Sequence, residues 1–338
     1  MYEEFFHLRK SPFGMNPDPG CLFMTTSHRE AFASLLYAIS SHKGFIVLTG
    51  DAGTGKTSLL RALIKVADSA SFSVILTPTL SADEFLELAL LDFGVVDPPA
   101  SKAQRIVRLQ EMLLDMRLRG KSPVLVVDEA HKLSPDVLEE IRLLTNFETT
   151  EQKLLQIVLA GQNDLTSTLN RYDLRQLKQR IEVRMALKPL SSADLKGYLN
   201  HRWQHAGADI PLPFTAEAIT LIGGASHGIP RVVNAICDNA LLLAYAGGEA
   251  RIGAAHIQHV LRDLDPSDAE LTPRNGAARP RANLNGGASR EEPPALRNSP
   301  ISPRSFLSLE EDEAPNKTPS RLRWAERMGS LQNRNQKP

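Results

Sequence analysis

The sequence predicts an α/β protein in which helices cover both faces of a mostly parallel sheet, followed by a small all-helical domain and a disordered tail. Between residues 44 and 190, short apolar strands alternate with helical patterns, as in sheets whose parallel strands are joined by crossover helices. Helical patterns alone continue over 191–265. Residues 266–338 hold 10 of the 22 prolines and show almost no periodic apolar pattern. Such a segment cannot bury enough apolar surface to offset the conformational entropy lost on folding.

The elements follow one another in a regular order. Residues 1–44 lead into an amphipathic helix, HREAFASLLYAISS, in which Phe32, Leu35, Leu36 and Ile39 recur at helical spacing. The predicted strands are 45–49, 74–78, 123–128, 154–160 and 183–187. The predicted helices between them are 56–68, 81–93, 102–119, 134–146 and 164–178. No internal repeat interrupts this order.

Capping residues divide the helical region into four segments. Ser191 or Ser192 begins the first, Thr215 the second, and the G-I-P of 228–230 the third, while a fourth covers about 254–264. The predicted divisions are therefore 1–44 (N-terminal segment and helix), 45–190 (α/β core), 191–265 (helical domain) and 266–338 (Pro-rich tail). In the tail, SRLRWAERMGSLQ at 320–332 is either a short partner-docking helix or an unstructured stretch with one Trp.

Composition indicates a globular protein of a reducing compartment. Lys plus Arg and Asp plus Glu both number 39, so no overall excess of positive charge points to nucleic acid or an anionic membrane. Cys21 and Cys237 lack metal-ligand spacing, and we interpret both as packing residues. The N-terminus MYEEFFHLRK lacks the pattern of a signal peptide. The apolar runs are too short for a membrane helix, so we expect a cytoplasmic protein without a membrane-spanning segment.

A phosphate-binding motif, GDAGTGKT at residues 50–57, lies between a strand and a helix. This is the setting in which G-x-x-x-x-G-K-[ST] binds nucleoside triphosphates. Its glycines allow backbone N–H groups to point at phosphate oxygens, Lys56 carries the charge for the β and γ phosphates, and the Thr57 hydroxyl can coordinate Mg²⁺. The predicted ATP-binding residues are Gly50, Asp51, Ala52, Gly53, Thr54, Gly55, Lys56, Thr57 and Ser58.

Two adjacent carboxylates, Asp128 and Glu129, follow the apolar run VLVV. We expect their strand to lie beside the phosphate loop, where Asp128 would hold Mg²⁺ together with Thr57. Glu129 would then polarise the attacking water. Asp128 begins a D-E-A-H sequence, which many helicases carry. A helicase of that type needs a second nucleotide-binding domain, whereas the residues after Asp128 complete the first sheet and then turn all-helical.

Three further stretches carry a resemblance to a known family. They are LLQIVLAGQNDL, which contains Gln162, HGIPRVVNAICDNAL, which contains Arg231, and the opening segment with its P-F, P-D-P and H-x-E-A. Over residues 2–265 the sequence resembles the AAA+ ATPases of the P-loop NTPase fold. Within them it is similar to the general secretion pathway protein A (ExeA-type) branch, which is related to MSHA pilus-biogenesis and exosortase-associated ATPases.

The resemblance implies roles for individual residues. Gln162 would sense the γ-phosphate or the water, and Arg231, in what would be a lid domain, would sense the nucleotide. Arg180, or Arg175 as the less favoured choice, would reach into a neighbouring subunit's site, so that hydrolysis depends on a ring of identical subunits. His131 receives no catalytic role. The sequence departs from the family at N-D in GQND, and the tail shows neither the membrane helix nor the periplasmic domain that many members carry.

Three functions are compatible with these residues. The favoured one is an ATPase that energises or regulates a secretion, pilus or polysaccharide-export machine from the cytoplasmic side, through a protein partner at the inner membrane. The second is a DNA-dependent regulator of the transposition-helper type. A basic stripe could then bind DNA, formed by Lys102, Arg105, Arg108, Arg117, Arg119 and Lys121. A nucleotide-binding scaffold without hydrolysis is disfavoured, because Lys56, Thr57, Asp128 and Glu129 are all present.

Overall fold

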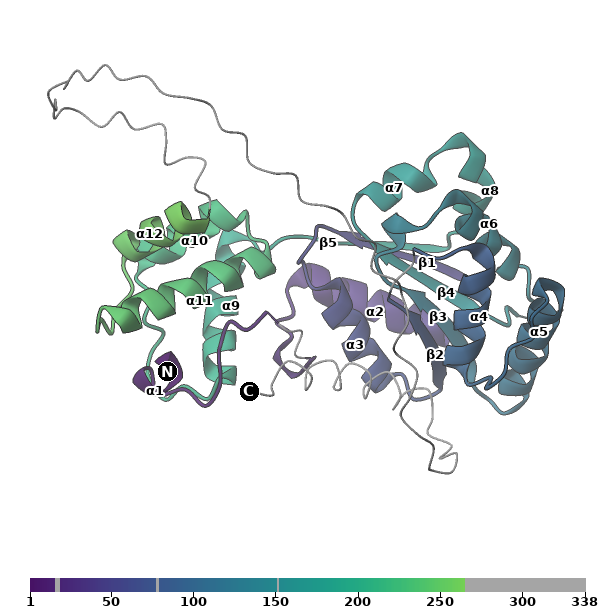
Figure 1. Cartoon of the computed structure of the whole chain (residues 1–338), viewed down its shortest axis with the longest axis horizontal. Helices are drawn as coiled ribbons and strands as arrows, with labels where there is room; N and C mark the ends of the chain where they lie inside the picture. Colours follow the sequence, from purple (N-terminus) through teal and green to yellow (C-terminus); the bar gives the residue numbers. More distant parts are fainter. Residues whose placement is uncertain (16–18, 77–78, 151, 265–338) are drawn as a thin grey trace, which may run out of the picture. The chain divides into compact units, whose positions relative to one another are not determined.

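The computed structural model describes residues 1–15, 19–76, 79–150 and 152–264, and Met1–Asp265 belong to one compact unit. Figure 1 shows a parallel sheet with its helices and a separate group of helices, α9 to α12. The Pro-rich tail and its segment 320–332 lie outside the described residues. No helix among the described residues is both long enough and apolar enough to cross a bilayer.

The sheet has five parallel strands in the described part of the chain, in the order β2-β3-β4-β1-β5. The strands are β1 (Phe45–Gly50), β2 (Ala70–Ile75), β3 (Ser122–Val127), β4 (Gln156–Gly161) and β5 (Val183–Leu187). The Asp128 strand, β3, ends beside the phosphate loop, as expected. It is not the neighbour of β1 in the sheet, because β4 pairs with both β1 and β3 and separates them. Strand order depends on tertiary packing, which apolar runs alone do not specify.

Two predicted elements also differ from the structure. The second strand covers 70–75 rather than 74–78, and Pro78 in the predicted range has no N–H for a ladder. At this edge strand, Asp92 accepts a hydrogen bond from the Val74 amide at 2.6 Å. The predicted helix 164–178 is divided into α7 (Asp164–Leu169), a 3₁₀ turn and α8 (Arg175–Gln179). The run Thr166-Ser167-Thr168 favours helix only weakly.

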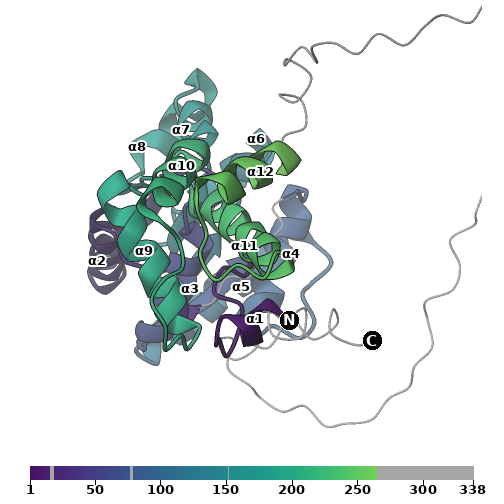
Figure 2. The same cartoon turned by 90° about the vertical axis from the view of Figure 1, so that its left-hand side faces the viewer.

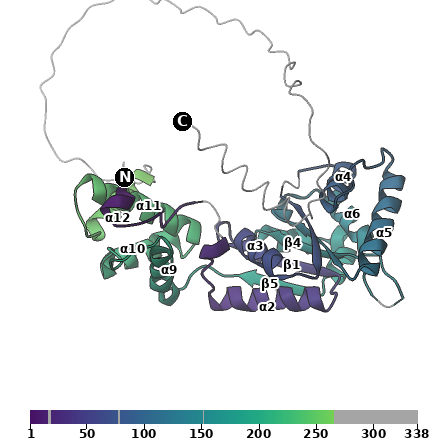
Figure 3. The same cartoon turned by 90° about the horizontal axis from the view of Figure 1, so that it is seen from below.

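Helices cover both faces of the sheet. On one face, Ile46 and Leu48 of β1 are buried with α2 (Thr26–Ser40) and α3 (Lys56–Val66); Figure 3 shows α2 lying along β5. On the other face, Phe45 and Val47 are buried with α7, α8 and three longer helices. Those three are α4 (Ala82–Phe93), α5 (Lys102–Leu118) and α6 (Pro135–Leu144). The continuous burial of β1, β3 and β4 follows from this double cover.

The helical domain has a core of its own. It contains α9 (Ser192–His205), α10 (Ala216–Ser226), α11 (Pro230–Ala246) and α12 (Ala254–Leu264). Ser191 caps α9 in a capping box with Asp194, Thr215 caps α10, and Pro230 occupies the first turn of α11, as predicted. The N-terminal helix α1 (Tyr2–Phe5) packs beside α11, as Figure 2 shows.

The N-terminal segment connects the helical domain to the sheet. Phe6 and Phe13 are fully buried in the helical core, whereas Leu22 and Met24 pack against the cluster of α2 and α3. The Tyr2 hydroxyl donates to Asp238 of α11 at 2.5 Å. The N-terminal segment therefore contributes side chains to both cores.

Candidate active site

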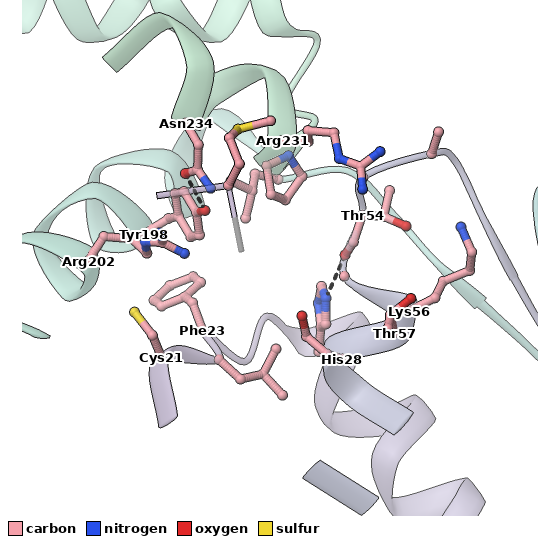
Figure 4. A pocket seen from close by; sticks show the side chains of 18 of the residues that line it. Cys21, Phe23, His28, Thr54, Lys56, Thr57, Tyr198, Arg202, Arg231 and Asn234 are labelled. Atoms are coloured by element: carbon pink, nitrogen blue, oxygen red, sulfur yellow. Dashed lines mark hydrogen bonds between the residues drawn. The ribbon is translucent and has the colours of Figure 1, made fainter. Parts of the chain in front are cut away.

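A cavity of about 360 Å³ lies between the phosphate loop, the N-terminal segment and the helical domain. Figure 4 shows Lys56 and Thr57 of α3 near one end, with Cys21, Phe23, Tyr198 and Asn234 near the other. The size is within the range of small-molecule and cofactor sites. One end is therefore lined by groups suited to phosphates and the other by aromatic and amide groups suited to a planar ring.

The phosphate loop lies where the sequence predicts it. Residues 52–58 line the cavity, whereas Gly50 and Asp51 do not. Gly53 and Gly55 have φ of +83° and +99°, values that other residues rarely adopt. A Cβ on Gly53 would lie 2.6 Å from the Arg231 Cβ, so the helical domain contacts the loop directly. Glycine is needed here both for the turn and for this close approach.

Lys56 is buried at the base of the loop. Its Nζ donates to the carbonyl oxygens of Gly50 at 2.8 Å and Asp51 at 3.0 Å. Burial lowers the pKa of Lys56, while the nearby carboxylates of Asp128, Glu129 and Asp51 oppose that shift. A bound polyphosphate would add negative charge beside this ammonium group and favour its charged form.

The pair of Thr57 and Asp128 supplies oxygen ligands at the same place. The Thr57 hydroxyl donates to Asp128 Oδ2 at 2.5 Å, although β1, which precedes the phosphate loop, and β3, which precedes Asp128, are separated by β4. Asp128 is buried directly after β3. Among the described residues, no group of three or more His, Cys, Asp or Glu side chains could hold a metal alone. Mg²⁺ is commonly bound by one or two protein oxygens together with substrate phosphates, so this pair fits Mg²⁺.

Glu129 and Gln162, two of the predicted catalytic residues, both line the cavity. Glu129 has a φ of +54°, a left-handed conformation that is uncommon for residues other than Gly. Its carboxylate lies 3.6 Å from His131 Nε2 and 3.5 Å from Lys132 Nζ. His131 Nδ1 accepts a hydrogen bond from the Gln162 backbone amide at 3.3 Å. The His131 side chain thus lies between the Glu129 carboxylate and the end of β4.

The departure at N-D has a structural counterpart. Asn163 Nδ2 donates to the Asp51 carboxylate at 2.6 Å. The end of β4 is therefore linked to the phosphate loop by the side-chain amide of Asn163.

The arginines fall into two groups. Arg231, at the start of α11, lines the cavity. Arg180 and Arg175 are exposed residues at the two ends of α8 and do not line the cavity. Arg175 lies over the Tyr172 ring, 4.6 Å from its centroid, and donates to the Tyr172 hydroxyl at 2.8 Å. A residue that serves a neighbouring subunit's site has no need to face its own.

Sequence reasoning missed the residues at the far end of the cavity. Tyr198 donates to Asn234 Oδ1 at 2.7 Å, which leaves the Asn234 amide nitrogen available as a donor. Arg202 donates to the carbonyl oxygens of Pro12 at 2.7 Å and Gly14 at 3.0 Å. Cys21, interpreted as a packing residue, is buried and also lines the cavity. These groups come from three separate segments of the chain, and their residue types and spacing do not predict that they meet.

His28 was also missed, although it begins the H-R-E-A sequence. Its side chain is buried, and its Nε2 lies 3.0 Å from the Thr54 carbonyl oxygen in the phosphate loop. Burial lowers the pKa of His28 from its ordinary value of 6.5. The imidazole is therefore neutral in the folded protein at neutral pH.

The free energy of unfolding is expected to fall as the pH drops below about 6.5, because unfolded His28 takes up a proton while folded His28 resists it. One such group contributes a slope of at most about 1.4 kcal/mol per pH unit. Urea unfolding at about pH 7.5 and 5.5 would measure the slope. His28→Gln should have a smaller slope than the unmodified protein, although His42 and His201, whose pKa values burial also lowers, remain. Equal slopes in both proteins would contradict this assignment.

Comparison with known proteins identifies similar sequences. A family model described as an AAA domain matches residues 39–169. General secretion pathway protein A of Aeromonas hydrophila is 42% identical over 254 residues, which cover 75% of this chain and 46% of that protein. The ATP-dependent target DNA activator B of Escherichia phage Mu is 26% identical over 253 residues, or 74% of this chain and 75% of that protein. This chain thus spans about half the length of the Aeromonas relative.

Solved structures share the fold at low sequence identity. ORC1 of Aeropyrum pernix, in complex with DNA, has a TM-score of 0.59 at 18% identity, covering 76% of this chain and 70% of that one. Cdc6p of Pyrobaculum aerophilum has a TM-score of 0.61 at 18% identity, covering 75% and 70%. At these identities the similarity establishes the architecture alone: a parallel sheet followed by a helical domain.

Proposed function

Since the chain belongs to the AAA+ ATPases of the general secretion pathway protein A type, we propose that it binds and hydrolyses ATP with Mg²⁺. The observation that carries this proposal is the meeting of Lys56, Thr57, Asp128 and Glu129 at one end of the cavity. A cation, a hydroxyl–carboxylate pair and a second carboxylate are the groups that phosphoanhydride hydrolysis uses. They come from both ends of a 71-residue interval, from Thr57 to Asp128, and are brought together by the fold.

Each group has a separate task in this proposal. The loop amides and Lys56 bind the β and γ phosphates, and Thr57 and Asp128 would hold Mg²⁺, which supplies charge neutralisation when bound. Glu129 accepts a proton from the attacking water. Gln162 hydrogen-bonds the γ-phosphate or the water, and Arg231 contacts the nucleotide from the helical domain. Arg180, with Arg175 as the alternative, stabilises transition-state charge in a neighbouring subunit.

The biological role follows the similarity to general secretion pathway protein A. We infer a homo-oligomeric ring that acts on the cytoplasmic side of the cell envelope. There it would energise or regulate the assembly of a secretion, pilus or polysaccharide-export machine through a protein partner at the inner membrane. The 42% identity extends over 254 residues, well beyond the ATPase motifs.

DNA-dependent regulation is the alternative, and the similarity to the phage Mu target DNA activator supports it. The proposed basic stripe gives it less support. Lys102 pairs with Glu140 at 2.7 Å, Arg105 with Glu87 at 2.7 Å and Arg119 with Asp115 at 2.9 Å. Arg108 lies 3.5 Å from Glu111. Paired charges of this kind have less net attraction for phosphates than a row of uncompensated cations.

ATP turnover by the full chain distinguishes the two roles. It is measured over a range of protein concentrations, with and without duplex DNA, at low and moderate salt. Specific activity that rises with protein concentration and ignores DNA supports a self-assembling ring with a protein partner. Stimulation by DNA that declines with salt would instead identify the DNA-dependent regulator.

Replacing Arg180 with Ala is expected to lower turnover by about 10³-fold, as expected for an arginine finger, without changing ATP affinity. Arg175→Ala is the matched control, at the other end of the same short helix. Mixing Arg180→Ala subunits with Lys56→Ala subunits should restore part of the turnover, since Arg180 of the second protein serves the intact site of the first. If Arg180→Ala kept full activity and Arg175→Ala lost most of it, Arg175 would be the arginine that reaches the neighbouring subunit's site.

A further inference from the structure

A continuous series of polar contacts runs from the phosphate loop to the connection between the sheet and the helical domain. His28 Nε2 lies 3.0 Å from the Thr54 carbonyl oxygen, and His28 Nδ1 lies 2.7 Å from Thr25 Oγ1. Thr25 Oγ1 lies 3.1 Å from Ser27 Oγ, which accepts a hydrogen bond from the Lys188 amide at 3.4 Å. We call Thr54, His28, Thr25, Ser27 and Lys188 the polar relay.

The chemistry of the partners fixes the direction of these hydrogen bonds. The Thr54 carbonyl can only accept, so His28 Nε2 must carry the proton that it donates. A neutral imidazole then accepts at Nδ1, from the Thr25 hydroxyl, and the Thr25 oxygen accepts in turn from the Ser27 hydroxyl. Every donor therefore points toward the phosphate loop. Hydrogen bonds arranged head to tail in this way strengthen one another.

At the loop, His28 fixes the orientation of one peptide group. In a trans peptide the C=O and the N–H point in opposite directions. Holding the Thr54 carbonyl toward α2 therefore directs the Gly55 N–H away from α2. Gly55 has a φ of +99°, and a Cβ there would lie 3.2 Å from His28 Nε2. The imidazole ring thus packs against the loop at Gly55 and hydrogen-bonds the Thr54–Gly55 peptide group, one residue before Lys56.

At its other end the relay reaches the residues that join the two cores. Lys188 follows β5, which ends at Leu187, and precedes the capping residue Ser191 of α9. Leu190 donates its amide to the Gly228 carbonyl at 2.8 Å, just before α11. We call 187–190 the connecting segment. A shift of the connecting segment would move the start of α9 relative to the sheet.

We propose that His28 is a positioning residue that holds the phosphate loop in its binding conformation, and that the polar relay couples nucleotide binding at the loop to the connecting segment. The proposal deepens the proposed ATPase function and rests on it. Thr25 and His28 are buried and Ser27 is half-buried, so water competes little for the bonds at the His28 end.

Two substitutions at one position separate the two halves of the relay. His28→Asn keeps an acceptor where Nδ1 stands and loses the donor to Thr54. His28→Gln keeps a donor at the distance of Nε2 and loses the acceptor for Thr25. Ser27→Ala removes the Ser27 contacts with both Lys188 and Thr25 but leaves the two His28 contacts in place. Glu30→Gln, exposed on the same helix, is the matched control. Thermal unfolding establishes that each variant is folded before it is compared.

Amide hydrogen exchange and ATP affinity are measured for all four variants. In His28→Asn, the amide exchange rate of residues 50–58 without nucleotide should rise by about tenfold, which is the effect of one lost hydrogen bond. The affinity for ATP should fall by about the same factor. His28→Gln and Ser27→Ala should bind ATP within about threefold of the unmodified protein, which is less than one hydrogen bond. Both should lose the nucleotide-induced change in exchange of the connecting segment.

Each outcome decides one part of the proposal. Unchanged loop exchange and ATP affinity in His28→Asn would overturn the positioning role. A preserved response of the connecting segment in His28→Gln and Ser27→Ala would overturn the coupling. If the unmodified protein binds no nucleotide, the proposed function and the coupling both fail. In that case the amide exchange of residues 50–58 without nucleotide, compared between His28→Asn and His28→Gln, still tests whether His28 holds the loop.

Discussion

The Glu129→Gln protein is expected to bind ATP with unchanged affinity and to hydrolyse it at least about 10²-fold more slowly, the usual scale for loss of a general base. Glutamine keeps the size of the side chain and its reach into the cavity, but it cannot accept a proton from water. Steady-state phosphate release and equilibrium binding of ATP measure the two quantities separately.

The control for this substitution is Glu139→Gln. Glu139 is an exposed carboxylate on α6 that pairs with Arg142 at 2.7 Å, and it does not line the cavity. It should leave both quantities unchanged. If Glu129→Gln hydrolysed ATP as fast as the unmodified protein, Glu129 would not be the general base, and another group would have to accept the proton.

Replacing Gly228 with Ala is expected to lower the free energy of unfolding by roughly 2 to 5 kcal/mol, from left-handed strain and overpacking together. Gly228 has a φ of +71°, and a Cβ there would lie 2.1 Å from the Leu190 carbonyl oxygen, a backbone atom that cannot rotate away. The substitution should also separate the connecting segment from the start of α11, because the Leu190–Gly228 hydrogen bond would be strained.

Gly224→Ala provides the matched comparison. Gly224 lies within α10, and a Cβ there meets nothing within 4 Å. Alanine favours a helix interior by up to about 1 kcal/mol relative to glycine, so this variant should be as stable as the unmodified protein or more so. Chemical denaturation measures both variants. Equal stability of Gly228→Ala and Gly224→Ala would show that the connection between the two cores is loosely packed.

Much of the fold could be predicted because several signals were local. The phosphate loop, the capping residues Ser191 and Thr215 and the apolar run before Asp128 each depend on neighbours in sequence. The strand order could not be predicted, because it is decided by which faces of β1, β3 and β4 are buried together. The division of the predicted helix 164–178 depends on how α7 and α8 pack. The periodicity of apolar residues does not predict such a break.

The candidate site shows the same contrast. Lys56, Thr57, Asp128 and Glu129 belong to motifs whose chemistry can be read from residue type and spacing. The far end of the cavity is formed by Cys21, Phe23, Tyr198 and Asn234. These residues meet only because the N-terminal segment packs against both cores. A buried histidine such as His28 is recognised as functional only when its partner in the phosphate loop is known.

The most direct measurement is the affinity of the full chain for ATP by isothermal titration calorimetry, with and without Mg²⁺. It is made for the unmodified protein, for Lys56→Ala, and for Lys65→Ala as a control at the exposed end of the same helix. We predict saturable binding of ATP that Mg²⁺ strengthens, a loss of at least about tenfold in Lys56→Ala from the missing charge-assisted hydrogen bonds, and no change in Lys65→Ala. Absence of binding at millimolar ATP, or equal affinity in Lys56→Ala, would contradict the assignment of the cavity as an ATP site.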